Sequence, residues 1–388
     1  MLLAVIMVLT TCAMSAQDQW CEATELPNKG SLMMFSDAAN GWVVSGRHVV
    51  TTQYIRVLRT RDSAKTWELD QEWFAGTGDR TERIIAFDMV DSLNGWIGGR
   101  RYFGWEMSPS LYRRAWVPGT VGIQWHFVDT KLPAGEEIRA IKVFSPKRLL
   151  VATSRGLIAK SIDDGESWTV IDTVEENLQV TQMHFIDEAS GWLSSYEHLY
   201  RTTNGGSSWE KIDYGEPFWI TSISFMDRDT GWLGGEAGRI SKTTNAGATW
   251  SSQWSTTGSR IEDFAFLNAN VGYAVGGGVN GGNGWLDSSR VLKTEDGGNT
   301  WRQIKHPRDV WIGGVSLIDS HTGYILAGQY VYRYCGDPLV SVKEDAIQAE
   351  SKCEYLFFDL LGRRIGDEAA GIVIEYDPCK AKGRVVTR

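Results

Sequence analysis

An eight-residue motif that ends in tryptophan recurs along the chain and limits the folds that this sequence can adopt. Its consensus is Ser/Thr, any residue, Asp/Asn, any residue, Gly, any residue, Ser/Thr and Trp. Complete copies occupy residues 161–168, 202–209, 243–250 and 294–301. Degenerate copies occur at residues 60–67 and at Trp125. From Trp125 onward the tryptophans are 43, 41, 41 and 51 residues apart. This spacing is typical of a propeller built from four-stranded blades.

A second motif runs in phase with the first. An apolar strand, an acidic turn and a Gly-aromatic pair occur at residues 35–42, 87–96, 185–192, 225–232, 266–273 and 317–324. One further unit, at residues 143–152, keeps the strand and lacks the Gly-aromatic pair. Seven units result. We therefore predict an all-β fold, a seven-bladed β-propeller that spans residues 17–338.

The tryptophan-ended motif itself predicts a tight hairpin. Its Asp or Asn side chain can accept hydrogen bonds from the backbone of the turn, and its glycine can adopt a positive φ. The tryptophan that follows, such as Trp209, begins the next strand and can cover the hairpin with its large apolar ring. We expect these tryptophans to be structural and to seal one blade against its neighbour.

These motifs resemble the Asp-box, or BNR, repeat. The combined unit is similar to the propellers of the photosystem II assembly factor (Ycf48-like) family, and the resemblance covers residues from about 20 to 337. It implies the propeller fold. It does not imply a photosystem role, because Asp boxes occur in enzymes and in binding proteins and lie away from the usual binding face.

Closure of the ring is predicted to use the beginning of the mature chain. No box follows the last unit, whereas the stretch QWCEATELP offers a strand in which Trp20 takes the place of a box tryptophan. Pairing of this strand with the last blade would remove an exposed sheet edge. A disulfide between Cys21 and Cys335 would join the two strands. Four cysteines remain if Cys12 is removed with the first residues, and four cysteines allow three pairings. If Cys21 pairs with Cys335, Cys353 and Cys379 are left to pair in the tail.

The first residues predict a signal peptide over residues 1–16. The stretch MLLAVIMVLTTCAMSAQ is an apolar run that ends in small residues, and it is too short to span a membrane as a helix. It lacks the usual positive charge at its start, and a lipid anchor at Cys12 is the alternative. No later stretch is apolar enough to cross a bilayer. We expect a protein that is secreted or held at the outer-membrane surface after passage through the periplasm.

Residues 339–388 predict a separate small β domain. The tail resembles the C-terminal sorting domain of type IX secretion substrates in the Bacteroidetes, on the basis of Asp359, Gly362, Arg363, Gly371 and residues 382–386. The resemblance implies passage across the outer membrane by the type IX secretion machinery. The usual upstream Asn-Pro strand is missing, so this would be a shortened form.

Composition excludes several classes of function. The formal net charge is -9 and no run of Lys or Arg occurs, so no nucleic-acid partner is expected. The six histidines are scattered singly, without the spacing of metal ligands, and we predict neither a metal nor a cofactor. Ser nucleophile elbows and phosphate-binding glycine loops are absent from the sequence. A glycoside hydrolase of the sialidase or xyloglucanase type is the enzymatic alternative, although the early Arg-Ile-Pro motif of sialidases is missing.

Loop lengths indicate where a partner would bind. Units one, two and six carry long insertions that gather on one sector of the ring, and a second group of side chains lies just before the innermost strands. We predict a non-enzymatic protein with no catalytic residues, which recognises a protein or a glycan through Arg and aromatic side chains. The candidate ligand-binding residues are Arg83, Arg100, Arg101, Tyr102, Trp105, Arg139, Trp219, Arg260, Trp285 and Trp311.

Overall fold

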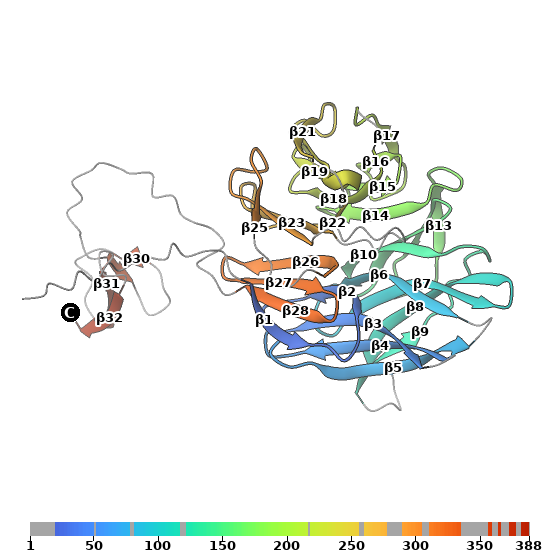
Figure 1. The fold of residues 1–388 in the computed structure, drawn as a ribbon, viewed down its shortest axis with the longest axis horizontal. Helices are drawn as coiled ribbons and strands as arrows, with labels where there is room; N and C mark the ends of the chain where they lie inside the picture. Colours follow the sequence, from blue (N-terminus) through green and yellow to red (C-terminus); the bar gives the residue numbers. More distant parts are fainter. Residues whose placement is uncertain are drawn as a thin grey trace, which may run out of the picture. The chain divides into compact units, whose positions relative to one another are not determined.

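The structure, a computed structural model, describes residues 20–49, 52–77, 81–116, 122–215, 218–255, 260–277, 289–304 and 310–334, and the backbone of four strands between 356 and 387. The chain forms two compact units, residues 1–340 and 341–388. The larger unit contains seven four-stranded sheets, and Figure 1 shows them arranged as blades around a common centre. The predicted all-β fold with seven blades is confirmed.

Six blades take their four strands in chain order, from the innermost strand outward. Blade 1 contains β2 (Gly30–Phe35), β3 (Gly41–Val49), β4 (Thr52–Thr60) and β5 (Glu68–Thr77). Blade 2 contains β6 (Glu82–Met89), β7 (Gly95–Phe103), β8 (Glu106–Trp116) and β9 (Ile123–Phe127). Blade 3 contains β10 (Ile138–Ser145), β11 (Arg148–Thr153), β12 (Leu157–Ser161) and β13 (Thr169–Thr173).

The next three blades repeat the pattern with shorter strands. Blade 4 contains β14 (Val180–Phe185), β15 (Gly191–Ser195), β16 (Leu199–Thr202) and β17 (Glu210–Ile212). Blade 5 contains β18 (Ile220–Phe225), β19 (Gly231–Gly235), the 3-10 turn η1 (Glu236–Gly238), β20 (Ile240–Thr243) and β21 (Ser251–Trp254). Blade 6 contains β22 (Ile261–Phe266), β23 (Gly272–Gly276), β24 (Arg290–Thr294) and β25 (Arg302–Ile304).

Blade 7 joins the two ends of the propeller. It contains β26 (Ile312–Asp319), β27 (Thr322–Ala327), β28 (Tyr330–Tyr334) and, as its outermost strand, β1 (Trp20–Glu25). Trp20 pairs with Tyr334, and its buried ring lies edge-on to Tyr273 of blade 6, with 5.5 Å between the ring centroids. Closure by the first strand is therefore confirmed, and Trp20 takes the position of a box tryptophan. The backbone of Cys21 lies opposite Arg333, but Cys335 and the predicted disulfide lie outside the described residues.

The smaller unit contains one sheet, in the order β30 (Arg364–Ile365), β29 (Leu356–Phe358), β31 (Ile372–Asp377) and β32 (Lys382–Thr387). This sheet agrees with the small β domain that the sequence of the tail predicts. Cys353 and Cys379, with the disulfide predicted between them, lie outside the described residues.

The Gly-aromatic pairs form the contacts between blades. In blade 4 the ring of Phe185 lies against Gly191, where an added Cβ atom would stand 2.6 Å from the ring, so only glycine fits. The ring of Phe225, the corresponding residue of blade 5, stacks on Trp192 of blade 4 at a centroid distance of 3.7 Å. Trp209 completes the seal between blades 3 and 4: it is half-buried, lies edge-on to Phe185, and donates from Nε1 to the Gly206 carbonyl at 3.2 Å.

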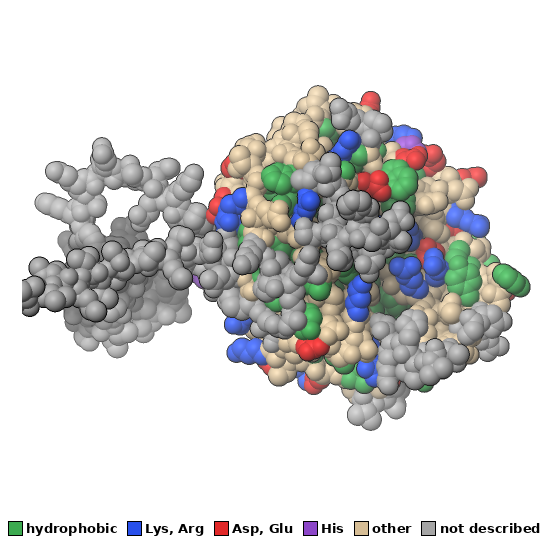
Figure 2. Space-filling view, in the orientation of Figure 1, with side chains coloured by type: hydrophobic (Ala, Val, Ile, Leu, Met, Phe, Trp, Pro, Cys, Tyr) green, Lys and Arg blue, Asp and Glu red, His purple; other side chains and the backbone are tan. Residues whose placement is uncertain are grey.

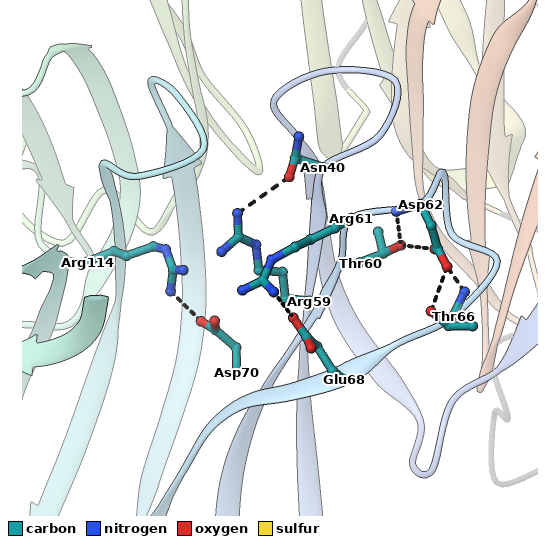
Figure 3. A network of polar contacts seen from close by, with 9 residues as sticks. All are labelled: Asn40, Arg59, Thr60, Arg61, Asp62, Thr66, Glu68, Asp70 and Arg114. Atoms are coloured by element: carbon teal, nitrogen blue, oxygen red, sulfur yellow. Dashed lines mark hydrogen bonds and ion pairs between the residues drawn. The ribbon is translucent and has the colours of Figure 1, made fainter. Parts of the chain in front are cut away.

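A buried ionic network replaces purely apolar packing between blades 1 and 2 (Figure 3). Arg114 of β8 is 2% exposed and pairs with Asp70 of β5. Trp125 Nε1 donates to the same carboxylate at 3.0 Å. The guanidinium carbon atoms of Arg59 and Arg114 lie 5.1 and 5.6 Å from the ring centroid of Trp42. Because burial and the charge of Arg114 both oppose a second cation, the pKa of Arg59 lies below its usual value.

Candidate functional site

The Asp boxes and the loops at the other ends of the strands define two faces of the propeller. We name as the upper face the one formed by the loops that enter the innermost strands and by the hairpins between second and third strands.

In the box of blade 3, Ser161 Oγ accepts the N–H of Gly165 at 2.8 Å, and Asp163 Oδ1 accepts the N–H of Ser167 at 2.9 Å. Hydrogen bonds from the hydroxyl and N–H of Ser167 lower the pKa of Asp163. This box carboxylate is fully used within the turn.

Arg100 of β7 and Arg139 of β10 share one buried carboxylate on the upper face. Arg100 Nη1 lies 2.6 Å from Glu137 Oε1, and Arg139 Nη1 lies 3.4 Å from Glu137 Oε2. Arg139 Nε also donates to the Val180 carbonyl of blade 4 at 3.0 Å. The side chain of Glu137 is 5% exposed, so the two arginines neutralise a charge that would otherwise be costly to bury. These two predicted residues tie blades 2, 3 and 4 together.

Arg260 and Trp311 form a similar tie across the ring. Arg260 Nε lies 2.5 Å from Glu262 Oε1, and Trp311 Nε1 donates to the same oxygen at 3.1 Å. The Trp311 ring covers Gly313, where an added Cβ atom would stand 2.2 Å from Cη2. Lys29, just before blade 1, places its ammonium 4.9 Å from the centroid of this ring. The structure therefore brings Arg260 and Trp311 together at the junction of blades 6, 7 and 1.

The hairpin formed by β7 and β8 holds a half-buried arginine among exposed aromatic rings. The Arg101 guanidinium carbon lies 4.2 Å from the ring centroid of Phe127 and 5.5 Å from that of Phe103. Phe103 and Phe127 are 51% and 40% exposed, and Trp105, between the two strands, is fully exposed. In Figure 2, hydrophobic side chains stand out at the edge of the molecule where Figure 1 places the end of this hairpin. We name Arg101, Phe103, Trp105 and Phe127 the hairpin surface.

The consecutive candidates in β7 do not form one cluster. Side chains alternate along a strand, and Arg100 and Tyr102 share one side, with 5.6 Å between the guanidinium carbon and the ring centroid. Arg101 and Phe103 point to the other side. Thus Arg100 is engaged with blade 3, whereas Arg101 belongs to the hairpin surface.

The remaining candidates are placed separately. Arg83 is exposed in β6, opposite Arg100 in the strand register. Trp219, just before β18, is 52% exposed and has its ring centroid 5.8 Å from that of Tyr196. Trp285 lies outside the described residues, so its part in a binding site stays a prediction.

A cavity of about 370 Å³ lies among the innermost strands, and residues from all seven blades line it. Of the candidate residues, Arg139 lines this cavity. Asp88 Oδ2 accepts the N–H of Val143 at 2.7 Å and lies 3.5 Å from Lys142 Nζ. Burial raises the pKa of Asp88 and lowers that of His184 to about 4, so His184 is neutral at pH 7. Its Nε2 lies 2.9 Å from the Phe225 carbonyl oxygen and must carry the proton to donate there.

Asp263, in β22 of blade 6, lines the same cavity. Its Oδ1 accepts the N–H of Phe264 at 2.9 Å, and its Oδ2 accepts the N–H of Val315 in blade 7 at 3.0 Å. Burial raises the pKa of Asp263 to about 7. Asp88 and Asp263 thus satisfy backbone N–H groups on the open edges of neighbouring innermost strands, which is a structural task.

The carboxyl groups that line the cavity already have hydrogen-bond partners in the protein. A glycoside hydrolase needs one carboxyl group as an acid and a second, facing it, as a base or nucleophile. Among the described residues that line the cavity, Asp88, Glu262 and Asp263 are each held by protein donors. Across all the residues that the structure describes, no group of three or more His, Cys, Asp and Glu side chains could hold a metal ion. The described residues also include no helix with the length and apolar character of a membrane span.

Sequence reasoning missed the two glutamates that organise the arginines. Glu137 and Glu262 each lie two residues from a partner, in the patterns Glu137-x-Arg139 and Arg260-x-Glu262. Residues two apart in a strand share a side, so these patterns could have indicated internal ion pairs. Phe127, the platform beneath Arg101, lies 26 residues away in the sequence and is brought close only by the pairing of β8 with β9.

Comparison with known proteins places these features in context. Residues 161–255 match the family model described as photosynthesis system II assembly factor YCF48. The structure of YCF48 bound to a D1 peptide is similar with a TM-score of 0.61 and 20% identity, over 83% of this chain and 100% of that one. YCF48 from Cyanidioschyzon merolae gives a TM-score of 0.57 and 18% identity, over 81% and 98%.

Similarity of fold extends to other propellers. The WD40 β-propeller domain of Doa1 gives a TM-score of 0.56 and 11% identity, over 82% of this chain and 96% of that one. No curated protein matches the sequence. At these identities the likeness to solved structures establishes the propeller fold, and function must be argued from the site.

Proposed function

We propose that this protein is a non-enzymatic propeller that binds an acidic segment of another polypeptide at the hairpin surface. The observation that carries the proposal is the position of Arg101 between the exposed rings of Phe103 and Phe127, beside the fully exposed Trp105. Exposed apolar patches mark interaction sites, and Trp and Arg are enriched among the residues that dominate binding energy.

The chemistry of Arg101 selects the kind of partner. Its Nε is buried and has no hydrogen-bond partner within the described residues. A carboxylate of a partner would supply an acceptor for the guanidinium and form a charge-assisted hydrogen bond. The aromatic rings around it would contact apolar side chains next to that carboxylate in the partner. An acidic segment with apolar neighbours therefore fits this surface best.

The comparisons support a protein partner in a limited way. One of the similar structures is of YCF48 bound to a D1 peptide, which shows that a propeller of similar fold takes a peptide ligand. The identity of 20% carries neither that peptide nor its site over to this chain. For this chain the argument rests on the hairpin surface.

Two tryptophans at the ends of β8 provide a matched test. Trp105 precedes β8 in the hairpin surface, whereas Trp116 ends the strand and is 61% exposed. Binding of short synthetic peptides that combine Asp or Glu with aliphatic residues would be measured by fluorescence anisotropy, with a glycan array in parallel. We expect Trp105→Ala and Arg101→Gln each to weaken peptide binding about tenfold or more, and Trp116→Ala to leave it unchanged.

The outcomes separate the alternatives. Peptide binding that is equally strong in Trp105→Ala and Trp116→Ala would show that the hairpin surface is not the site. Binding to glycans that is lost in Trp105→Ala, with no binding to peptides, would replace the polypeptide partner of the hairpin surface by a saccharide. Hydrolysis of a glycan on the array would revive the glycoside hydrolase alternative.

We also propose that the protein acts outside the cytoplasm, at the cell surface or after release. The apolar run at residues 1–16 and the resemblance of residues 339–388 to a type IX sorting domain support this proposal. Deletion of residues 339–388 should leave a folded propeller in the periplasm, which cell fractionation and protease accessibility would reveal. Normal surface display of the shortened protein would disprove a sorting role for the tail.

A further inference from the structure

A second cavity, of about 610 Å³, lies between blades 4 and 5, away from the blade 2 hairpin. Its size falls in the usual range for sites that take small molecules. Three aromatic side chains line it, together with one arginine and several hydroxyl groups. The lining residues that matter here are Tyr214, Phe218, Arg239, Ser241, Trp250 and Ser252.

The cavity exists because blade 5 has two small side chains where blade 4 has large ones. In blade 4, Leu193 pairs with Tyr200, and Tyr200 pairs with Lys211 of the outermost strand. The corresponding positions of blade 5 hold Ser241 and Ser252. The Tyr200 ring is buried in the core between blades 3 and 4. Serine at the equivalent position leaves the space between blades 4 and 5 unfilled.

Among the described residues that line this cavity, Arg239 carries the only positive charge. Its guanidinium carbon lies 5.9 Å from the ring centroid of Phe218, and within the described residues it forms no ion pair. The turn η1 precedes it, and Arg239 N–H donates to the Glu236 carbonyl at 3.2 Å. The guanidinium is thus placed at the cavity with its hydrogen-bonding capacity free for a ligand.

The aromatic side chains offer ring surfaces and few polar contacts. Tyr214 Oη lies 3.0 Å from the Glu197 carbonyl oxygen and 3.1 Å from that of Phe218, so its proton is already used. Trp250 Nε1 donates to the Gly247 carbonyl at 3.1 Å. The polar groups left for recognition are Arg239, the carboxylate of Asp213 and hydroxyl groups that include those of Ser241 and Ser252.

We propose that this cavity binds an acidic saccharide, a hexuronate or a short chain that ends in one. The single guanidinium matches a single carboxylate, the serine hydroxyls match sugar hydroxyls, and the aromatic rings match the apolar C–H face of a pyranose. Asp213 also lines the cavity, and its carboxylate can accept hydrogen bonds from sugar hydroxyl groups. One arginine beside this carboxylate supplies too little positive charge for a doubly charged phosphate.

The test uses the full protein and D-glucuronate, with D-glucose and benzoate as comparison ligands. Isothermal titration and ligand-detected NMR would measure binding. We expect glucuronate to bind, glucose to bind at least about tenfold more weakly, and benzoate not to compete. Arg239→Gln should weaken glucuronate binding about tenfold or more, whereas Arg155→Gln, at an exposed arginine of blade 3, should not change it.

A second variant fills the cavity. Ser241→Tyr introduces the side chain that blade 4 carries at the same position, and it should abolish glucuronate binding in a folded protein. Should this variant fail to fold, Arg239→Gln still decides. No binding of glucuronate to the unaltered protein, equal binding by Arg239→Gln, or equal affinity for benzoate would each overturn the proposal. None of these results bears on the hairpin surface, so the two proposals can fail separately.

Discussion

Gly165 lies directly on the indole ring of Trp96, and an added Cβ atom would stand 2.4 Å from Cη2 of that ring. This contact joins the Asp box of blade 3 to the Gly-Trp pair of blade 2. The backbone at Gly165 also has φ of 83°, a region that favours glycine. Two independent reasons therefore fix glycine at this position of the box, one in the turn itself and one in the neighbouring blade.

Gly165→Ala should destabilise the propeller by about 3 kcal/mol, because the strain of positive φ adds to the collision with Trp96. Gly215 has φ of 85°, and among the described residues beyond its chain neighbours no atom lies within 4 Å of an added Cβ. Gly215→Ala should therefore cost only about 1 kcal/mol, from backbone strain alone. Urea unfolding of the two variants would measure the difference, and equal costs would show that the contact with Trp96 is not a constraint.

Trp209 and Trp219 should respond differently to truncation. Trp209→Ala removes a half-buried ring from the seal between blades 3 and 4 and should cost about 3 kcal/mol in the free energy of unfolding. Trp219 is 52% exposed, and Trp219→Ala should lower the midpoint of thermal unfolding by only a few degrees. Calorimetry of both variants would check this, and similar losses would contradict the structural role of the box tryptophan.

Removal of the Asp70 charge should destabilise the contact between blades 1 and 2. Asp70→Asn leaves the buried Arg114 without a counter-charge and should cost about 3 to 5 kcal/mol. Glu68→Gln is the matched control, because the Arg61–Glu68 pair of the same network is exposed (Figure 3) and should contribute less than about 1 kcal/mol. A cost for Asp70→Asn as small as that for Glu68→Gln would mean that Arg114 is solvated.

Asp263 should make stability depend on pH between about 4 and 7. Burial raises its pKa from 3.8 to about 7, so in this range the folded protein holds a proton that the unfolded chain has lost. The contribution of Asp263 to the free energy of unfolding should therefore fall as pH rises from 4 to 7, by up to about 4 kcal/mol, while buried neutral His184 acts in the opposite direction. Denaturant unfolding across this range should show that the difference in stability between the unaltered protein and Asp263→Asn changes with pH in this direction. Identical slopes for the two proteins would show that Asp263 is not protonated in the fold.

The repeats made the blades predictable, because each box and each Gly-aromatic pair encodes a local turn and a local contact. Residues such as Gly191 and Trp209 satisfy requirements of their own hairpin, and their spacing alone reveals the period. Even closure by Trp20 followed from the lack of a box after the last unit. These features depend on short stretches of sequence, which are visible without knowledge of the fold.

The site was less predictable, because its partners come from different blades. Arg139 lines the central cavity and stays a predicted ligand-binding residue, but its pairing with Glu137, whose carboxylate also holds Arg100, was not predicted from the sequence. Glu137 lies in the same blade as Arg139, whereas Arg100 reaches this carboxylate from blade 2, and that second contact is not visible in the sequence. The cavity beside Arg239 was missed for the same reason, since it reflects what Ser241 fails to fill.

The pairing of β1 with β28 sets an order of events during synthesis of the chain. The first strand of the propeller leaves the ribosome long before residues 330–334, the strand with which it pairs, have been made. Until then β1 has no strand to pair with, and the most recently formed blade exposes the face that the next blade will cover. Loop closure over such a span is slow, so partly made chains should be vulnerable to aggregation and to proteases. A chaperone that covers β1 during this interval would protect the nascent propeller most effectively.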